Sequence, residues 1–238
     1  MKRYLFISLF VVCVMTLSSC SSTRYVSESL KVSAPTDIPL IEPYTDVFYI
    51  EKGNQAQYND SLTYLAHETL LDCLEDNASW FPYGKILYLD DKDVWIDMAG
   101  DMEMFLAHCR ESRRGDVPSI PIPESLAAFM AANNLPYAMM LYHSGLTRSW
   151  KNYTRAVATD VAVAVGMAAV GILLGGVAPV VYGSSIKATS RFTVAVANAA
   201  EGTVSFYNSV EEGCEPLDRA NDYELLKRLF RKYPSAKY

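Results

Sequence analysis

The side chains that could do acid–base or metal chemistry are scattered along this chain of 238 residues. His67-Glu68 begins like the helix of a zinc protease, but position 71, where the second histidine would bind the metal, is leucine. Four aspartates crowd together as in a cation-binding loop, although the glycine and the distal glutamate of an EF-hand loop are missing. These aspartates are Asp90, Asp91, Asp93 and Asp97. We therefore expect no catalytic residue, no bound metal and no cofactor.

Two more histidines stand beside possible nucleophiles, His108 next to Cys109 and His143 next to Ser144. Neither pair lies in a nucleophile elbow or a phosphate-binding loop, the local patterns that position such groups for chemistry. Distant residues can still converge in the fold. An enzyme or a ligand-binding protein with a site near the acidic loop 90–97 is therefore the alternative function.

Residues 1–20, at the start of the chain, have the layout of a secretory signal. Lys2 and Arg3 precede an uncharged run of 14 residues at 4–17, and small residues then come before a cysteine. A spanning helix needs roughly 20 apolar residues, so this run is short for a membrane anchor. An uncleaved anchor and a plain cleaved signal are the alternatives to a lipoprotein signal.

Leu-Ser-Ser-Cys at 17–20 resembles the lipobox of bacterial lipoproteins. The resemblance implies cleavage between Ser19 and Cys20 and acylation of Cys20, so the lipid bilayer is the first partner that we expect. Each buried methylene of an acyl chain contributes about 0.8 kcal/mol, and two or more chains give stable anchoring. Among lipoproteins, Ser21 and Ser22 after the cysteine favour the outer membrane. No acidic cluster follows closely, so we expect the periplasmic face.

The composition of the chain limits the class of protein, the partners and the cysteine pairing that we expect after removal of the signal. Half of the residues are hydrophobic and 20% are charged, which is typical of a globular protein. Removal of residues 1–19 takes away two of the 21 basic residues and none of the 27 acidic ones, so the mature net charge is −8. This acidic balance argues against nucleic acid as a partner. Cys73, Cys109 and Cys214 then remain, either as one disulfide and one thiol or as three thiols.

The patterning predicts an α/β (α+β) domain at 45–238 behind a tether at 20–44. We expect a small mixed sheet with flanking helices, followed by a C-terminal β-hairpin and a last helix. Alternating and β-branched segments predict strands at 45–50, 85–90, 137–142, 190–198 and 203–209. Apolar spacings of three and four predict helices at 60–76, 98–109, 123–132 and 221–233.

This order of elements resembles the small α/β domain shared by the TolB amino-terminal domain and the curli-secretion (CsgG-like) lipoproteins. The features that carry the resemblance are the strand and helix at 46–76, the helix–strand step at 124–145, and the hairpin at 192–209 with its Glu201-Gly202 turn. The resemblance covers most of residues 45–233. It implies an envelope lipoprotein that assembles or docks without catalysis.

A long apolar segment departs from that domain. Residues 161–181 carry no charge and are rich in Val, Ala and Gly, within an insertion at 151–187. Their number is enough to span a bilayer, but their composition is marginal for insertion. The alternatives are a buried or self-associating helical hairpin, a membrane-spanning or membrane-dipping helix, and strands of a multimeric barrel. Glycines let helices approach closely, so we expect the contact residues to be Gly166, Gly171, Gly175 and Gly176.

Together these patterns predict a non-enzymatic, lipid-anchored envelope protein. We expect a scaffold, or an accessory of assembly or transport, rather than a catalyst. The apolar insertion would let it form a homo-oligomer, bind another envelope protein or contact the membrane.

Overall fold

The computed structural model describes residues 24–32, 34–53, 55–89, 92–112, 115–155, 157 and 186–234. The predicted lipobox and most of the apolar insertion lie outside these ranges. Outside the described residues are therefore the predicted cleavage, acylation and contact positions Ser19, Cys20, Gly166, Gly171, Gly175 and Gly176. The first two aspartates of the acidic loop, Asp90 and Asp91, lie outside them as well.

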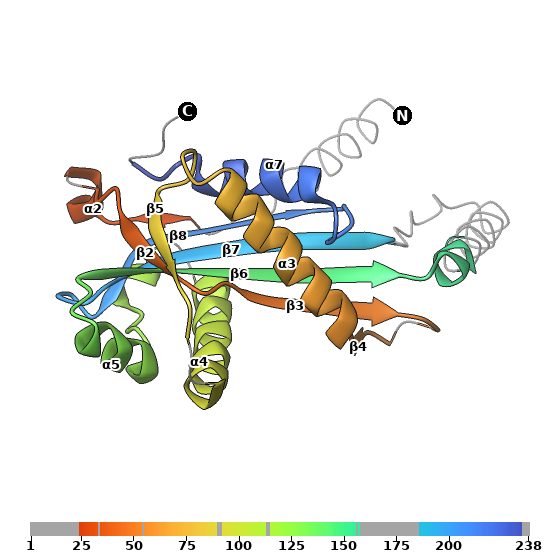
Figure 1. Cartoon of the computed structure of the whole chain (residues 1–238), viewed down its shortest axis with the longest axis horizontal. Coiled ribbons are helices and arrows are strands. Elements are labelled where there is room, and N and C mark those ends of the chain that lie inside the picture. Colours follow the sequence, from red (N-terminus) through yellow and green to blue (C-terminus); the bar gives the residue numbers. More distant parts are fainter. Residues whose placement is uncertain are drawn as a thin grey trace, which may run out of the picture.

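Eight strands of the described chain form one mixed sheet (Figure 1). Its order is β1-β8-β7-β6-β2-β5, while β3 continues beyond β2 along the same side of β6, and β4 pairs with β3. The pairs β2–β5, β2–β6 and β3–β6 are parallel, and the other pairs are antiparallel. The strands are β1 (Tyr25–Val26), β2 (Ile38–Ile41), β3 (Tyr44–Ile50), β4 (Gln57–Tyr58), β5 (Tyr83–Leu87), β6 (Tyr137–Arg148), β7 (Ala188–Asn198) and β8 (Thr203–Glu212).

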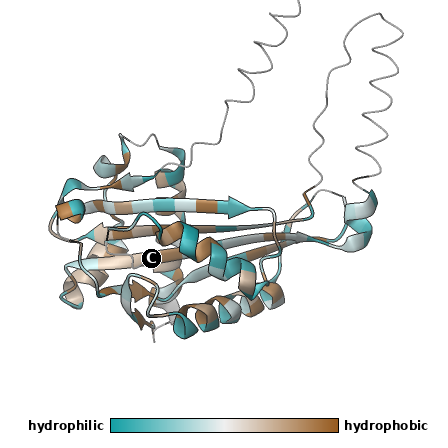
Figure 2. Cartoon of the chain, turned by 90° about the horizontal axis from the view of Figure 1, so that it is seen from above, coloured by the Kyte–Doolittle hydropathy of each residue, from teal (hydrophilic) through white to brown (hydrophobic). Residues whose placement is uncertain are grey.

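Helices cover both faces of this sheet, with α3 and α7 on one face and α4 and α5 on the other (Figure 1). Successive residues of β7 point into the two layers, since Val194 packs in the α3–α7 core and Ala195 in the α4–α5 core. Figure 2 shows hydrophilic and hydrophobic residues interleaved along the helices, as expected for helices with one buried side. The helices are α2 (Glu28–Val32), α3 (Asp60–Asp76), α4 (Lys92–Glu111), η1 (Val117–Ser119), α5 (Glu124–Ala132) and α7 (Arg219–Phe230). The predicted fold class is confirmed.

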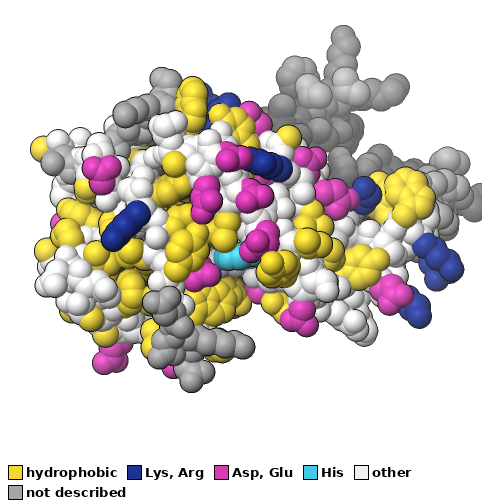
Figure 3. Space-filling model, in the orientation of Figure 1, with side chains coloured by type: hydrophobic (Ala, Val, Ile, Leu, Met, Phe, Trp, Pro, Cys, Tyr) yellow, Lys and Arg dark blue, Asp and Glu magenta, His cyan; other side chains and the backbone are white. Residues whose placement is uncertain are grey.

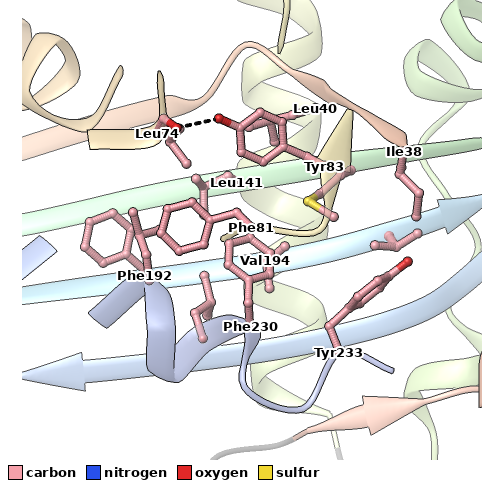
Figure 4. Packing of buried hydrophobic residues seen from close by; sticks show 14 of the residues in the cluster. Ile38, Leu40, Leu74, Phe81, Tyr83, Leu141, Phe192, Val194, Phe230 and Tyr233 are labelled. Atoms are coloured by element: carbon pink, nitrogen blue, oxygen red, sulfur yellow. Dashed lines mark hydrogen bonds between the residues drawn. The ribbon is translucent and has the colours of Figure 1, made fainter. Parts of the chain in front are cut away.

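The core between the sheet, α3 and α7 is rich in aromatic side chains (Figure 4). Phe81 packs against Phe230 with ring centroids 5.6 Å apart. The hydroxyl of Tyr83 donates to the carbonyl oxygen of Leu74 at 2.7 Å, which ties β5 to the end of α3. Full burial of a large apolar side chain contributes roughly 1.5–3 kcal/mol, so this layer supplies much of the stability.

The β6–β7 pair is the longest in the sheet and determines where the insertion leaves it. Its register runs without a shift from Tyr137↔Asn198 to Thr147↔Ala188. Both ends of the insertion therefore lie side by side at one end of the sheet, where residues 150–155 form a helical turn after β6. The predicted third strand at 137–142 is six residues too short, because polar residues such as His143 interrupt the apolar run that marked it.

The C-terminal hairpin predicted from the alternating segments is confirmed as β7 and β8. Gly202 has a φ of +63°, a left-handed conformation that favours glycine over other residues. The side chain of Asn198 accepts a hydrogen bond from the amide of Ala200 at 3.0 Å, which closes the turn. The turn therefore has residues that suit it, an asparagine that binds the backbone and a glycine at the left-handed position.

The structure places the start of the domain earlier than residue 45. β1, α2 and β2 lie within the stretch predicted as a tether, and Leu30, Ile38 and Leu40 from them are buried in the main core. These elements are two to five residues long, too short to produce a recognisable periodicity. The helix predicted at 98–109 is also longer. It begins at Lys92, so Asp93 and Asp97, which were expected in an acidic loop, belong to α4.

Candidate functional site

A cleft of about 370 Å³ lies at the edge of the sheet, between the part where β5 pairs with β2 and the part where β4 pairs with β3. The last pair of β5 is Ile41↔Leu87, and the first pair of β4 is Phe48↔Tyr58. The stretch between Ile41 and Phe48 therefore has neither strand as its neighbour on that edge. The cleft fills this gap, with walls from the β2–β3 connection, β4, α3 and α4. Its volume lies within the range of about 300–1,000 Å³ that is usual for ligand pockets.

The start of α3 is fixed over the cleft by hydrogen bonds to its neighbours. The side chain of Asn59 caps the helix by accepting from the amide of Leu62 at 2.9 Å. The hydroxyl of Thr63 accepts from the amide of Val47 in β3, also at 2.9 Å. These contacts hold the first turns of α3 against β3, and thereby set Tyr64 and His67 into the wall of the cleft.

Aromatic rings form the opposite wall and the rim. The ring of Tyr44 stacks on that of Tyr142 with centroids 5.4 Å apart, and lies 5.5 Å from the ring of Trp95. Tyr58 meets Phe48 edge-on at 6.1 Å. Because Tyr44 contacts rings from both β6 and α4, its position is set by packing, while Tyr58 and Tyr64 are exposed at the mouth. Figure 3 views this side of the molecule and shows hydrophobic and acidic side chains gathered around a histidine.

Carboxylates give the cleft an acidic character. Glu42 lies in its wall, with Oε1 3.7 Å from Nε2 of His67, and burial lowers the pKa of that histidine. Asp60 contributes a second carboxylate at the start of α3. Behind the wall, the buried carboxylate of Asp46 accepts a hydrogen bond from the hydroxyl of Tyr142 at 3.2 Å, and burial raises its pKa.

One buried polar group in the cleft lacks a partner among the described residues. Thr45 lines the cleft and is 4% exposed, yet its Oγ1 makes no hydrogen bond there. Leaving such a group unpaired costs roughly 1–3 kcal/mol. A buried hydroxyl of this kind is a candidate contact for a ligand that enters the cleft.

The residues singled out from the sequence do not converge on a catalytic centre within the described chain. His67 lies on α3 as predicted and lines the cleft. Asp93 and Asp97 belong to α4, and Asp97 is not among the residues that line the cleft. Within the described ranges no group of three His, Cys, Asp or Glu side chains is arranged to bind a metal. The alternative site around Asp91, Asp93 and a histidine includes positions outside the described residues and stays a prediction.

The two histidine pairs of the sequence analysis lie in different surroundings, since His108 is exposed in the last turn of α4 and His143 is buried in the sheet. His143 is fully buried in β6, where Nε2 lies 2.9 Å from Oγ of Ser190 and the ring stacks on Phe192 at 4.2 Å. Burial lowers its pKa to about 3, so the ring is neutral at pH 7. The described cysteines are free thiols, and burial raises the pKa of Cys73 to about 11 and of Cys109 to about 12. Neither is a reactive nucleophile in that state.

The end of the sheet from which the insertion leaves carries a second cluster, which we name the insertion base. It comprises residues 149–155 and 186–187 and the facing turn at 51–53. The Nδ2 of Asn152 donates to the carbonyl of Gly53 at 2.9 Å, and the hydroxyl of Ser149 donates to the carbonyl of Glu51 at 3.2 Å. These bonds fix the helical turn against the tip of β3.

Aromatic and basic side chains cover the insertion base. Trp150 is 68% exposed, and its ring centroid lies 5.8 Å from that of Tyr153. Ile186, at the other end of the insertion, is exposed as well. Figure 3 shows lysines and arginines gathered at one end of the molecule. The exposed basic side chains are Lys52, Lys151 and Arg155. Lys187 lies at the other end of the insertion and pairs with Glu215 at 2.7 Å. No helix in the described part of the chain is both long and apolar enough to cross a bilayer.

Sequence reasoning missed both clusters for different reasons. The cleft residues Glu42 and Tyr44 fell in the stretch assigned to the tether, and Trp95 comes from a helix on the other face. No local pattern links those segments. The insertion base had a readable signal, because Trp150, Tyr153 and basic residues directly precede the apolar segment, a combination typical of membrane interfaces.

Comparison with known proteins adds no family. Neither a protein-family model nor a curated protein matches the sequence. Among solved structures, a PelC dodecamer from Paraburkholderia phytofirmans is similar, with a TM-score of 0.32 and 7% identity over 85% of this chain and 89% of that chain. A PelC point variant, also a dodecamer, has the same TM-score of 0.32 and 8% identity over 86% and 91% of the two chains.

The LpoB C-terminal domain from Salmonella enterica has a TM-score of 0.26 and 10% identity over 79% of this chain and 95% of that domain. TM-scores of this size reflect only a partial overlap of strands and helices. The TolB and CsgG-like resemblance likewise stays a prediction. The comparisons thus assign this chain to no family, and the function has to be argued from its own residues.

Proposed function

We propose that this chain is a non-enzymatic, lipid-anchored protein of the bacterial outer membrane, facing the periplasm, and that its domain contacts the bilayer a second time through the insertion at 151–187. It would serve as a scaffold or an accessory of assembly or transport. The observation that carries the proposal is the insertion base, where exposed aromatic and basic side chains surround the point at which the apolar segment leaves the sheet.

The composition of the insertion base suits a membrane interface. Tryptophan and tyrosine are enriched where headgroups meet hydrocarbon, because their rings are amphipathic. Basic residues close to an anionic lipid surface contribute about 1 kcal/mol each. Lys52, Lys151 and Arg155 lie together at this end of a chain that is otherwise acidic, so the charge distribution orients this end toward anionic lipid.

The register of β6 and β7 limits the kind of contact. Thr147 and Ala188 are paired, so the strand ends that flank the insertion lie about 5 Å apart, the spacing of neighbouring strands. One crossing of a bilayer would separate the ends by roughly 30 Å. We therefore favour a dipping contact or self-association over a single span.

Vesicle binding of a chain that starts at residue 20 and carries Cys20→Ser tests the second contact without the lipid anchor and without the apolar run at 4–17. We expect it to float with vesicles of phosphatidylethanolamine and phosphatidylglycerol. Replacing residues 161–181 by a Gly/Ser segment of equal length should abolish flotation. Exchanging Lys52, Lys151 and Arg155 for Gln should lower the partition coefficient roughly 100-fold on anionic vesicles.

The matched control exchanges Lys85, Arg231 and Lys232, basic residues away from the insertion base, for Gln. If this control variant loses as much binding as the first triple variant, net charge alone explains the partition and the proposed contact is wrong. If the Gly/Ser variant keeps its flotation but dissociates on a sizing column, the insertion serves self-association instead.

A further inference from the structure

We propose that the cleft between β4, α3 and α4 binds the ammonium or guanidinium group of an organic cation. This inference goes beyond the proposed membrane contact, because the cleft lies on the edge of the sheet and involves none of the residues of the insertion base. Three independent features of the cleft lead to it: its charge, its rings and its unpaired hydroxyl.

The charge of the lining favours a cation. Glu42 and Asp60 line the cleft, and no lysine or arginine does so among the described residues. The basic group beside Glu42 is His67, and burial lowers the pKa of this histidine, which disfavours its charged form. Two carboxylates in a partly enclosed site attract a positively charged ligand and repel an anionic one.

The rings of the cleft suit the same ligand. Trp95 and Tyr44 lie 5.5 Å apart in one wall, and Tyr58 and Tyr64 stand at the mouth. Aromatic faces attract lysine-like and arginine-like cations through their quadrupole, and tryptophan does so most strongly. The same rings bury the alkyl stem of such a group, which is the part that water solvates poorly.

The hydroxyl of Thr45 supplies a specific polar contact. It is buried in the cleft and has no hydrogen-bond partner among the described residues. As an acceptor it can receive an N–H from an ammonium or guanidinium group, which carries only donors. An empty cleft leaves this hydroxyl unsatisfied, whereas a bound cation satisfies it and lies between the two carboxylates.

Fluorescence of Trp95 tests the assignment in the full chain held in detergent micelles. Exchanging exposed Trp80 and Trp150 for Phe leaves Trp95 as the reporter. The probes are the capped tripeptides Gly-Lys-Gly and Gly-Arg-Gly, with Gly-norleucine-Gly as the neutral counterpart, and pentylammonium against pentanol. We expect saturable changes of emission with the cationic probes and none with the neutral ones. The tighter of peptide and free amine identifies the source of the cation.

Three variants make the test specific. Glu42→Gln should weaken cation binding roughly fivefold or more, since it removes one charge and keeps the acceptor for the amide of Leu89. Thr45→Val keeps the shape of the side chain and should weaken binding roughly tenfold without loss of thermal stability. Asp97→Asn, which removes an exposed charge of α4 outside the cleft, is the control and should leave binding unchanged.

Two results would overturn the proposal. One is an equal response to norleucine and lysine peptides, or no response to any cation, in a chain that folds normally. The other is an equal loss of binding in Asp97→Asn and Glu42→Gln, because a diffuse negative field would then explain the attraction. Thr45→Val keeps the test valid even if Glu42→Gln disturbs the fold.

Discussion

A buried carboxyl group in α7 makes the stability of this protein depend on pH in a predictable direction. Asp222 is fully buried in the fourth position of the helix, and neither of its oxygens has a hydrogen-bond partner among the described residues. Burial, with a smaller effect from Asp218, raises its pKa from 3.8 to about 8. The folded chain therefore holds a proton on Asp222 at neutral pH that the unfolded chain releases.

The magnitude follows from proton linkage. Between the unfolded pKa near 4 and the folded pKa near 8, each pH unit costs the folded state about 1.4 kcal/mol of stability. The contribution is fully present below the lower value and is lost as the pH rises through the higher one. From pH 5 to pH 7 this single group should lower the free energy of unfolding by roughly 2.7 kcal/mol.

Asp222→Asn removes the ionisation and should therefore flatten this dependence. The assay is urea unfolding followed by circular dichroism, for both chains, in steps from pH 5 to pH 8. The lowered pKa of buried His143 makes stability rise with pH up to about 6.5 in both chains, so the difference between them isolates Asp222. That difference should grow by about 1.4 kcal/mol per pH unit in favour of the asparagine chain.

Asp72→Asn, an exposed aspartate on α3, is the matched control and should follow the parent chain at every pH. A difference in the free energy of unfolding between Asp222→Asn and the parent that is the same at every pH would reflect only the burial of an amide. If the difference does not change between pH 5 and pH 8, Asp222 has an ordinary pKa and the reasoning from its burial is refuted.

Three further predictions concern the anchor, the cap of α3 and a close contact in β6. Cys20→Ser should leave a chain without acyl groups, measured by mass spectrometry of its N-terminal part; a Cys20→Ser chain that is still cleaved and acylated would contradict the lipobox prediction. Asn59→Ala removes the hydrogen bond to the amide of Leu62 and should lower the free energy of unfolding by about 1 kcal/mol, measured by urea unfolding, whereas an unchanged midpoint would show that the cap is dispensable. Gly145→Ala would set its Cβ 2.5 Å from Cβ of Pro216, so a fall of several degrees in melting temperature is expected, and an unchanged value would show that the segment around Pro216 adapts freely.

The elements that sequence reasoning predicted well are those with a strong local pattern. The helix at 60–76 corresponds to α3 because Ala66, Leu70, Cys73 and Leu74 share its buried side. The hairpin of β7 and β8 was equally readable from alternation and the turn at Gly202. Short elements such as β2 were not, since four residues carry no period and their burial depends on partners distant in sequence.

The candidate cleft could not be predicted because its residues meet only in the folded chain. Glu42, Thr45 and Tyr58 come from the edge of the sheet, His67 from one helical layer and Trp95 from the other. No spacing in the sequence brings such residues together. The burial of Asp222 was hidden for a related reason, since an acid in the first turn of an amphipathic helix usually faces solvent.

The central claim, that the insertion base lies against the bilayer, is tested most directly by quenching of tryptophan fluorescence with brominated lipids. Two versions of the full acylated chain are reconstituted in vesicles, one retaining only Trp150 and the other only Trp80. Both side chains are exposed, at 68% and 48%, but Trp80 lies in the turn between α3 and β5, outside the insertion base. We predict strong quenching of Trp150 and little of Trp80. Equal quenching of the two, or none of Trp150, would contradict the claim.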